Sequence, residues 1–239
     1  MGGFAVAVAL VAAAVGAAAC GSGAPKPSGL IAFDNRGKVF IVNPDGSGRR
    51  RLTRGKAWQS FPDWSPDGKR IAFVESPGEY NGPWSVHVTN SDGSANRTVM
   101  RSAEPLYSPD WAPDGRKIAF DDGGVIWVVS VETRRARRLV SGRAPAWSND
   151  GRRIAFGDLV SGTDNVDLFV VSADGSGPKE RLTRIPDADI EATWSPDGKR
   201  LVFQHGNEDI DQVNADGTGK SRYSRLGTAA TSTGHPTGR

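Results

Sequence analysis

A twelve-residue pattern occurs four times in this chain and constrains its fold more than any other feature. Each copy places a tryptophan before a Ser-Pro-Asp-Gly turn or a close variant of it, and an apolar segment ending in phenylalanine after the turn. The four tryptophans are 47, 36 and 47 residues apart. Repetition at such a period is typical of folds in which each copy is one structural unit. The copies occupy residues 62–73, 109–120, 145–156 and 192–203.

The centre of the pattern predicts a tight hairpin. In the first copy Pro66 fixes φ at the second position of a type I turn, Asp67 tolerates the third, and Gly68 takes the left-handed fourth. Apolar residues alternate on both sides, as in two paired strands. We therefore expect the aspartates to form turns rather than act as acids, and the tryptophans to anchor packing between units. These residues are Asp67, Asp114, Asp150 and Asp197, and Trp64, Trp111, Trp147 and Trp194.

A second motif, Asp-Gly followed by Ser or Thr, predicts another hairpin in most units. A segment such as Arg-Leu-Thr at residues 51–53 or 181–183 usually follows it. Each unit then has four strands in about 40 to 45 residues, which is the size of a β-propeller blade. The second motif occupies residues 42–48, 89–94, 172–177 and 214–219.

These tandem units resemble the TolB β-propeller family and the propeller domains of prolyl oligopeptidase relatives. The resemblance implies an all-β fold, a β-propeller of about five four-stranded blades, over residues 29–226. TolB propellers usually have six blades, and their C-terminal strand commonly completes the first blade. Here the first unit, residues 29–56, has no Trp-Ser-Pro-Asp-Gly strand before it, and the irregular tail, residues 227–239, has no tryptophan.

We therefore expect incomplete ring closure, with an exposed edge strand through which copies could self-associate. A shifted reading frame stays open as the origin of the tail, because codons for residues 235–239 can encode Pro-Asp-Trp-Pro when read from the third base. The resemblance covers the propeller of TolB and not its separate N-terminal α/β domain.

The N-terminal segment, residues 1–20, is predicted to be a targeting signal. Residues 4–19 are apolar or glycine, a run shorter than the roughly 20 residues of a spanning helix. Small residues before Cys20 resemble the lipobox of bacterial lipoproteins, in which the cysteine carries the lipid, although no Lys or Arg precedes the run and Ala17 replaces the usual Leu. We expect a lipid anchor on Cys20, a flexible linker over residues 21–28 and an exported protein of the cell envelope, periplasm or extracellular face. An unlipidated cleaved signal peptide and a buried helix are the alternatives.

Composition excludes several classes of site. The net charge is only +3 and the basic residues are scattered, which argues against a nucleic-acid partner. One cysteine permits neither an internal disulfide nor a metal site built on several cysteines. The three histidines are far apart, and His87, in an alternating stretch, is expected to be a half-exposed strand residue.

Recognition is expected on the face opposite the Asp-Gly hairpins, because the connections there differ in length and sequence. Tyr80 and Trp84 are the aromatic contact candidates, and the acidic residues suit a cationic partner, a peptide or Ca²⁺. Solubilising loop chemistry without a specific site is the alternative. The acidic candidates are Glu75, Glu79, Asp121, Asp122, Asp158, Asp164, Glu208 and Asp209.

We expect a non-enzymatic, envelope-associated scaffold that binds a protein or peptide and needs no cofactor. The chain has no Gly-x-Ser-x-Gly elbow, phosphate loop or zinc motif. Two other hypotheses stay open. One is a calcium-dependent hydrolase or lactonase that works in the propeller channel, and the other is a degraded paralogue without a function of its own.

Overall fold

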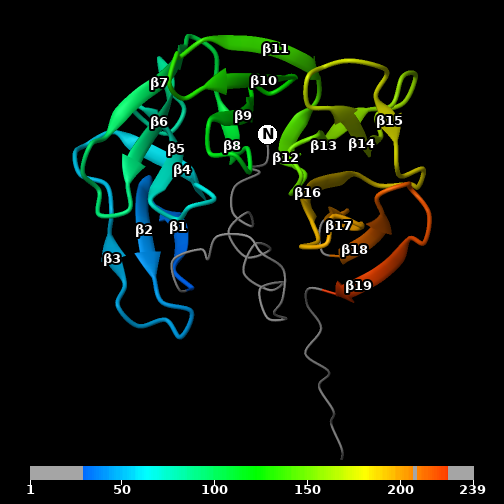
Figure 1. The fold of residues 1–239 in the computed structure, drawn as a ribbon, viewed down its shortest axis with the longest axis horizontal. Coiled ribbons are helices and arrows are strands. Elements are labelled where there is room, and N and C mark those ends of the chain that lie inside the picture. The colour runs from blue at the N-terminus through cyan, green and yellow to red at the C-terminus, as the bar shows by residue number, and fades with distance from the viewer. Residues whose placement is uncertain (1–28, 207–208, 226–239) are drawn as a thin grey trace, which may run out of the picture.

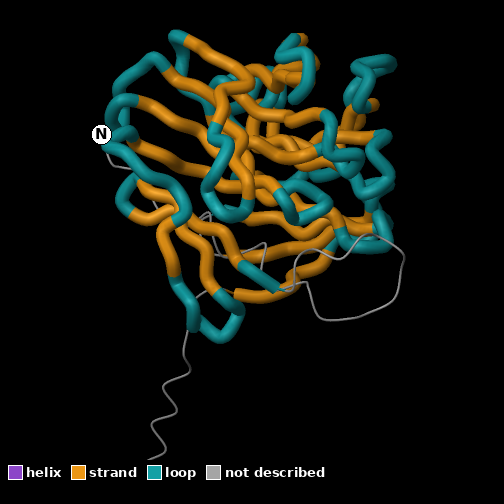
Figure 2. The backbone as a smooth tube through the Cα atoms, turned by 60° about the vertical axis from the view of Figure 1, so that its left-hand side comes forward, coloured by secondary structure: helices purple, strands orange, loops and turns teal. Residues whose placement is uncertain are grey.

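The computed structural model describes residues 29–206 and 209–225, and every regular element in these ranges is a β-strand (Figure 2). No helix in the described ranges is long and apolar enough to span a membrane. The predicted signal peptide (1–20), Cys20, the linker (21–28) and the tail (227–239) lie outside the described residues.

The strands form five antiparallel sheets in chain order. The first contains β1 (Ile31–Asn35), β2 (Lys38–Val42) and β3 (Arg50–Arg51). The second contains β4 (Trp58–Trp64), β5 (Arg70–Ser76), β6 (Trp84–Asn90) and β7 (Arg97–Ser102). The third contains β8 (Tyr107–Trp111), β9 (Lys117–Asp121), β10 (Val125–Ser130) and β11 (Ala136–Ser141). The fourth contains β12 (Arg143–Trp147), β13 (Arg153–Leu159), β14 (Val166–Ser172) and β15 (Glu180–Arg181). The fifth contains β16 (Asp189–Trp194), β17 (Arg200–His205), β18 (Asp209–Asn214) and β19 (Ser221–Arg225).

The sheets are arranged radially as the blades of a β-propeller, which confirms the predicted fold (Figure 1). The innermost strands β4, β8, β12 and β16 contact one another in turn, and β1 contacts β4. In the first blade the described residues form three strands, and no strand within 29–206 and 209–225 lies on the inner side of β1. Within the described residues the first and fifth blades stand apart at the open side of the ring (Figure 1). Self-association through this opening stays a prediction.

The Ser-Pro-Asp-Gly segments form the expected turns. The N–H of Gly68 donates to the carbonyl of Ser65 at 2.8 Å, and Gly68 has a φ of 64°. The Ser65 hydroxyl donates to the Asp67 carboxylate at 2.6 Å, and this bond is the main reason why the pKa of Asp67 is lowered. The aspartate therefore holds the turn, as predicted.

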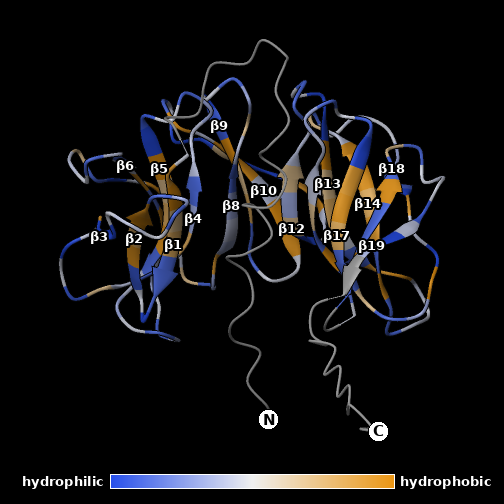
Figure 3. Ribbon diagram, turned by 90° about the horizontal axis from the view of Figure 1, so that it is seen from below, coloured by the Kyte–Doolittle hydropathy of each residue, from blue (hydrophilic) through white to orange (hydrophobic). Residues whose placement is uncertain are grey.

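The hydrophobic core lies between neighbouring blades rather than at the centre of the ring. Four clusters of buried residues each join two successive sheets. Figure 3 shows the apolar residues concentrated in the strands and polar residues in the loops at both ends. Trp111, Trp147 and Trp194 are buried in these clusters, and Trp64 packs partly buried against one, which confirms their role as anchors.

The connections define two faces of the propeller. The β4–β5 and β6–β7 turns and their equivalents lie at one end of the strands, which we call the hairpin face. The β5–β6 link and its equivalents, together with the links between blades, lie at the other end, which we call the variable-loop face.

Candidate functional site

The loops of the variable-loop face are shorter than the sequence predicts. Strand pairing continues beyond the phenylalanine that ends each repeat. Glu75 pairs with Ser85 in the β5–β6 ladder, and Asp121 lies opposite Ile126 in the β9–β10 ladder. Asp158 belongs to β13. The prediction that these three carboxylates lie in loops is therefore wrong. The β5–β6 and β13–β14 loops comprise residues 77–83 and 160–165.

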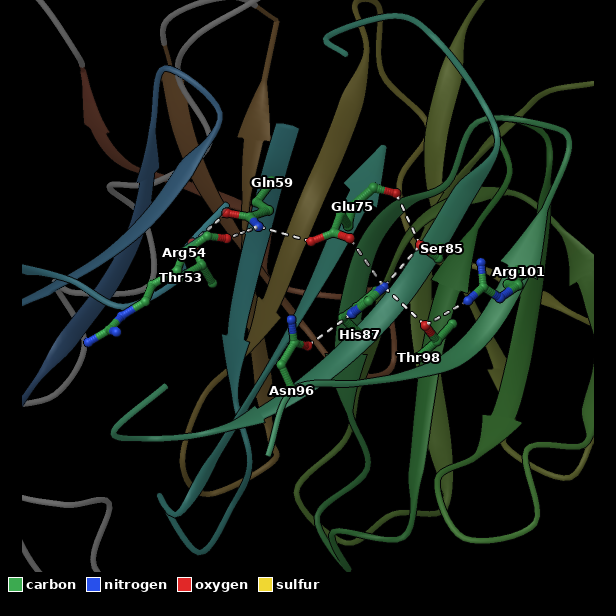
Figure 4. Close-up of polar contacts among 9 residues, drawn as sticks. All are labelled: Thr53, Arg54, Gln59, Glu75, Ser85, His87, Asn96, Thr98 and Arg101. Carbon is green, nitrogen blue, oxygen red and sulfur yellow. Dashed lines mark hydrogen bonds and ion pairs between the residues drawn. The ribbon is translucent and has the colours of Figure 1, made fainter. Parts of the chain in front are cut away.

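Glu75 belongs to a polar network at the junction of the first two blades (Figure 4). The Gln59 amide nitrogen donates to Glu75 at 2.9 Å, and the Thr53 hydroxyl donates to the Gln59 amide oxygen. The second Glu75 oxygen lies 3.6 Å from Nε2 of His87. This network connects the link after β3 to strands of the second blade, so Glu75 is engaged in holding the blades together.

His87 is buried, which corrects the expectation of a half-exposed strand residue. Its Nδ1 lies 2.9 Å from the Asn96 side-chain oxygen, and Nε2 lies 3.1 Å from the Ser85 hydroxyl and 3.2 Å from that of Thr98. The ring also stacks on Phe73, with centroids 5.4 Å apart. Both ring nitrogens thus have polar side-chain partners within hydrogen-bond distance. The polar partners allow a histidine to be buried at this position.

The two acidic residues after Phe120, Asp121 and Asp122, also make contacts that stabilise the fold. The Asp121 side chain is buried, and its carboxylate accepts the backbone N–H groups of Ala144 and Gly123, each at 3.0 Å. Burial raises the pKa of Asp121 above its usual value. Asp122 accepts the Trp127 indole N–H at 2.8 Å, which fixes the short loop to the blade.

Two further candidates are also occupied by contacts within the protein. Asp158 forms an ion pair with Lys179 and accepts a hydrogen bond from the Ser141 hydroxyl at 2.8 Å. Trp84 is 7% exposed and lies in the cluster between the second and third blades. Trp84 is therefore a packing residue in this structure and presents little surface to a partner.

Tyr80 is the most exposed of the large hydrophobic side chains in the described ranges, at 77%. It lies in the β5–β6 loop beside Glu79, whose negative charge raises the pKa of the Tyr80 hydroxyl. Leu159, at the end of β13, is 54% exposed on the same face. Sequence reasoning missed Leu159 because its phase in the strand alternation becomes visible only once the extent of β13 is known.

Asp164 lines a hollow of about 500 Å³ at the junction of the fourth and fifth blades. Asp167, a fully buried carboxylate, contacts two of its lining residues: it pairs with Arg181 and accepts a hydrogen bond from the Asn165 side-chain amide at 2.8 Å. Sequence reasoning missed Arg181 and Arg184 as lining residues, although the repeated Arg-Leu-Thr-Arg tetrapeptide is a signal that could have found them. The hollow is lined by Asp164, Asn165, Arg181, Arg184, Ile185, Pro186, Asp187 and Ala188.

The acidic candidates are thus spread over several blades and do not converge on one centre. Asp209 was also expected in a loop, but it is the first residue of β18 and pairs with Arg222 at 2.7 Å. Glu208 lies outside the described residues. Across residues 29–206 and 209–225, no group of three or more His, Cys, Asp or Glu side chains is arranged to hold a metal ion. Calcium binding stays a prediction.

Comparison with protein families and curated proteins gives one broad and two short matches. The family model of the TolB β-propeller domain matches residues 69–238. Dipeptidyl-peptidase 5 of Porphyromonas endodontalis is 51% identical over 43 residues, which are 17% of this chain and 6% of that enzyme. The enzyme of the same name from Porphyromonas gingivalis is 46% identical over 41 residues, again 17% of this chain and 6% of the enzyme. The chain therefore spans a small part of these peptidases.

Solved structures share the architecture at low identity. TolB from Acinetobacter baumannii has a TM-score of 0.73 and 20% identity, covering 85% of this chain and 55% of that chain. A putative TolB from Agrobacterium tumefaciens has a TM-score of 0.68 and 23% identity, covering 84% and 79%. An oligogalacturonate lyase in complex with manganese has a TM-score of 0.66 and 12% identity, covering 84% and 63%. At these identities the likeness shows the fold alone.

Proposed function

This chain belongs to the TolB β-propeller domain family, and on that premise we propose that it is a non-enzymatic scaffold of the cell envelope. Its variable-loop face binds a partner protein or peptide. The rigid blades position the loops, and the loops differ from blade to blade, which is the usual arrangement of a recognition surface.

One observation carries this proposal. The described residues contain three exposed large hydrophobic side chains, Tyr80, Leu159 and Tyr223, and two of them extend from the variable-loop face. Exposed aromatic and aliphatic side chains cost solvation free energy unless a partner covers them, and tyrosine is enriched among residues that dominate binding.

Acidic residues on this face favour a partner that carries a basic group. Glu79 is exposed next to Tyr80, and Asp164 lines the hollow at the fourth and fifth blades. The other acidic candidates that the structure describes on this face are engaged in contacts within the protein. A partner with an apolar side chain for Tyr80 and a basic group for Glu79 therefore fits this surface best.

We infer an envelope location from the family together with the N-terminal sequence. The apolar run of residues 4–19 ends at Cys20, the residue that would carry a lipid anchor. An anchored propeller would present its loops to other envelope proteins. No cofactor takes part in this proposed function.

The test is a comparison of full-length variants in pull-downs from envelope extracts of the source cells. We expect Tyr80→Ala and Glu79→Lys to weaken capture of a specific protein by about tenfold, as loss of an interface anchor typically does. Glu132→Lys is the matched control, because Glu132 is an exposed glutamate in the β10–β11 turn on the hairpin face. Equal capture by the Tyr80 and Glu132 variants would contradict the proposal.

A further inference from the structure

The tetrapeptide Arg-Leu-Thr-Arg occurs twice at equivalent places in the propeller. Residues 51–54 link the first blade to the second, and residues 181–184 link the fourth blade to the fifth. Each copy borders a hollow. The first has a volume of about 230 Å³ and is lined by Arg51, Thr53, Arg54 and Gly55, and the second is the hollow of about 500 Å³ that contains Asp164.

The two copies make equivalent hydrogen bonds to the backbone. In both, Nε of the first arginine donates to the carbonyl of the threonine, at 2.5 Å in Arg51 and 2.9 Å in Arg181. In both, the threonine hydroxyl accepts a backbone N–H from the strand next to the outermost one, from Val39 of β2 in the first copy and Leu168 of β14 in the second. The two hollows can therefore be compared residue by residue.

Their electrostatic environments differ at one equivalent position. The residue before Leu168 is Asp167, whose buried carboxylate neutralises Arg181. The residue before Val39 is Lys38, so the strand beside the first hollow has a cation where the strand beside the second has an anion. Burial, followed by the positive charge of Arg51, lowers the pKa of Lys38, while Glu75 opposes this shift. The Lys38 ammonium therefore lies close enough to the Arg51 guanidinium for the two positive charges to repel each other.

No ion pair among the described residues neutralises the first hollow. The described ion pairs include neither arginine of the first copy, nor Lys38. Arg51 donates to the Gly55 carbonyl at 3.0 Å, and Lys38 donates to backbone carbonyls. Figure 4 shows the Arg54 side chain pointing away from the network in which Glu75 is engaged. The hollow therefore has positive charge and unused N–H donors.

We propose that the hollow lined by Arg51, Thr53, Arg54 and Gly55 binds an oxyanion, the carboxylate or phosphate group of a ligand. Guanidinium groups bind such anions with paired, charge-assisted N–H donors. The volume suits one anionic group rather than a whole drug-sized ligand, which needs about 300 Å³ or more. The second hollow lacks this property because Asp164, Asp167 and Asp187 offset its arginines. This site does not depend on the proposed scaffold role.

The test is a titration of the full-length ¹⁵N-labelled chain with inorganic phosphate and, separately, with acetate at constant ionic strength. We expect saturable amide shifts at Thr53, Arg54 and Gly55. Arg54→Ala should weaken binding by about tenfold, the effect of one lost charge-assisted hydrogen bond. The matched control Arg184→Ala, the same position in the second copy, should change it by less than about twofold. Lys38→Asp, which gives the first hollow the acid of the second, should weaken binding at least as much as Arg54→Ala.

The two anions distinguish the source of the ligand group. Tighter binding of phosphate would assign a phosphorylated ligand, and binding of acetate at least as tight would assign a carboxylate such as an acidic peptide side chain. Saturation by neither anion, or equal losses in the Arg54 and Arg184 variants, overturns the proposal. Arg54→Gln keeps the polar stem and repeats the test if Arg54→Ala perturbs amides outside the first two blades.

Discussion

The carboxylate of Asp63 in one blade accepts the backbone N–H of Trp111 in the next, with Oδ2 and N 2.9 Å apart. Asp110 and Trp147 repeat this relationship at 2.6 Å. In the fourth blade the equivalent residue is Ala146, which has no carboxylate. Its backbone carbonyl instead accepts the indole N–H of Trp194 in the fifth blade, at 3.1 Å. A hydrogen bond between blades therefore accompanies each buried tryptophan anchor, even where the aspartate is missing.

We expect Asp63→Ala to lower the free energy of unfolding by about 1–3 kcal/mol, because the partly buried N–H of Trp111 loses its acceptor. The thermal midpoint should fall by about 2–4 °C for each kcal/mol in a chain of this length. Asp63→Asn, which retains a side-chain oxygen, should lose less, and Asp164→Ala, at an exposed position, should change little. Equal stability of the Asp63 and Asp164 variants would contradict the assignment.

Two turn glycines offer a matched test of contact between blades. Gly46 and Gly93 have φ values of 81° and 87° in equivalent hairpins. A Cβ on Gly46 would meet nothing within 4 Å, whereas one on Gly93 would lie 2.4 Å from the carbonyl oxygen of Leu52 in the first blade. Gly46→Ala should therefore cost about 1 kcal/mol from the left-handed backbone alone. Gly93→Ala should cost clearly more in chemical denaturation, and the same loss for both would show that the hairpin moves freely.

The lowered pKa of Asp174 predicts that the folded protein loses stability in acid. Hydrogen bonds from the Ser176 hydroxyl, then from the Ser176 backbone N–H and the Ser172 hydroxyl, lower its pKa from 3.8 to about 2. Between these values the unfolded chain binds more protons than the folded one, so stability rises with pH. The contribution of Asp174 is complete above about pH 4 and is lost as the pH falls toward 2. Thermal unfolding of Asp174→Asn across this range should show a shallower pH dependence than the parent, and parallel curves would refute the assignment.

The predicted anchor can be tested directly at Cys20. In bacteria grown with labelled palmitate we expect the full-length chain to incorporate label and to fractionate with membranes. Cys20→Ser should abolish both, because the cysteine sulfur is the proposed attachment atom. Membrane association that survives in the unlabelled Cys20→Ser protein would instead favour an uncleaved apolar segment.

Much of the fold could be predicted from local sequence, because each blade repeats the same short-range turn chemistry. Ser65, Asp67 and Gly68 form their turn from contacts a few residues apart, so the pattern alone is sufficient. The sequence has no Trp-Ser-Pro-Asp-Gly repeat before residue 31, and the described part of the first blade correspondingly contains three strands. Strand ends were less predictable. Glu75 and Asp158 are paired in strands that extend beyond the apolar segment of each repeat.

Short-range patterns in the chain were enough to identify the repeating unit, its two hairpins and the face on which the loops vary. Which acidic residues of that face are exposed depends on how the blades pack. Asp121 is buried by backbone N–H groups that include one from the next blade, whereas Glu79 is exposed in its loop. The same holds for the two Arg-Leu-Thr-Arg links, which differ in charge balance through Lys38 and Asp167 on a neighbouring strand. Local turns need only nearby residues, while burial and charge compensation depend on groups that folding brings together from distant parts of the chain.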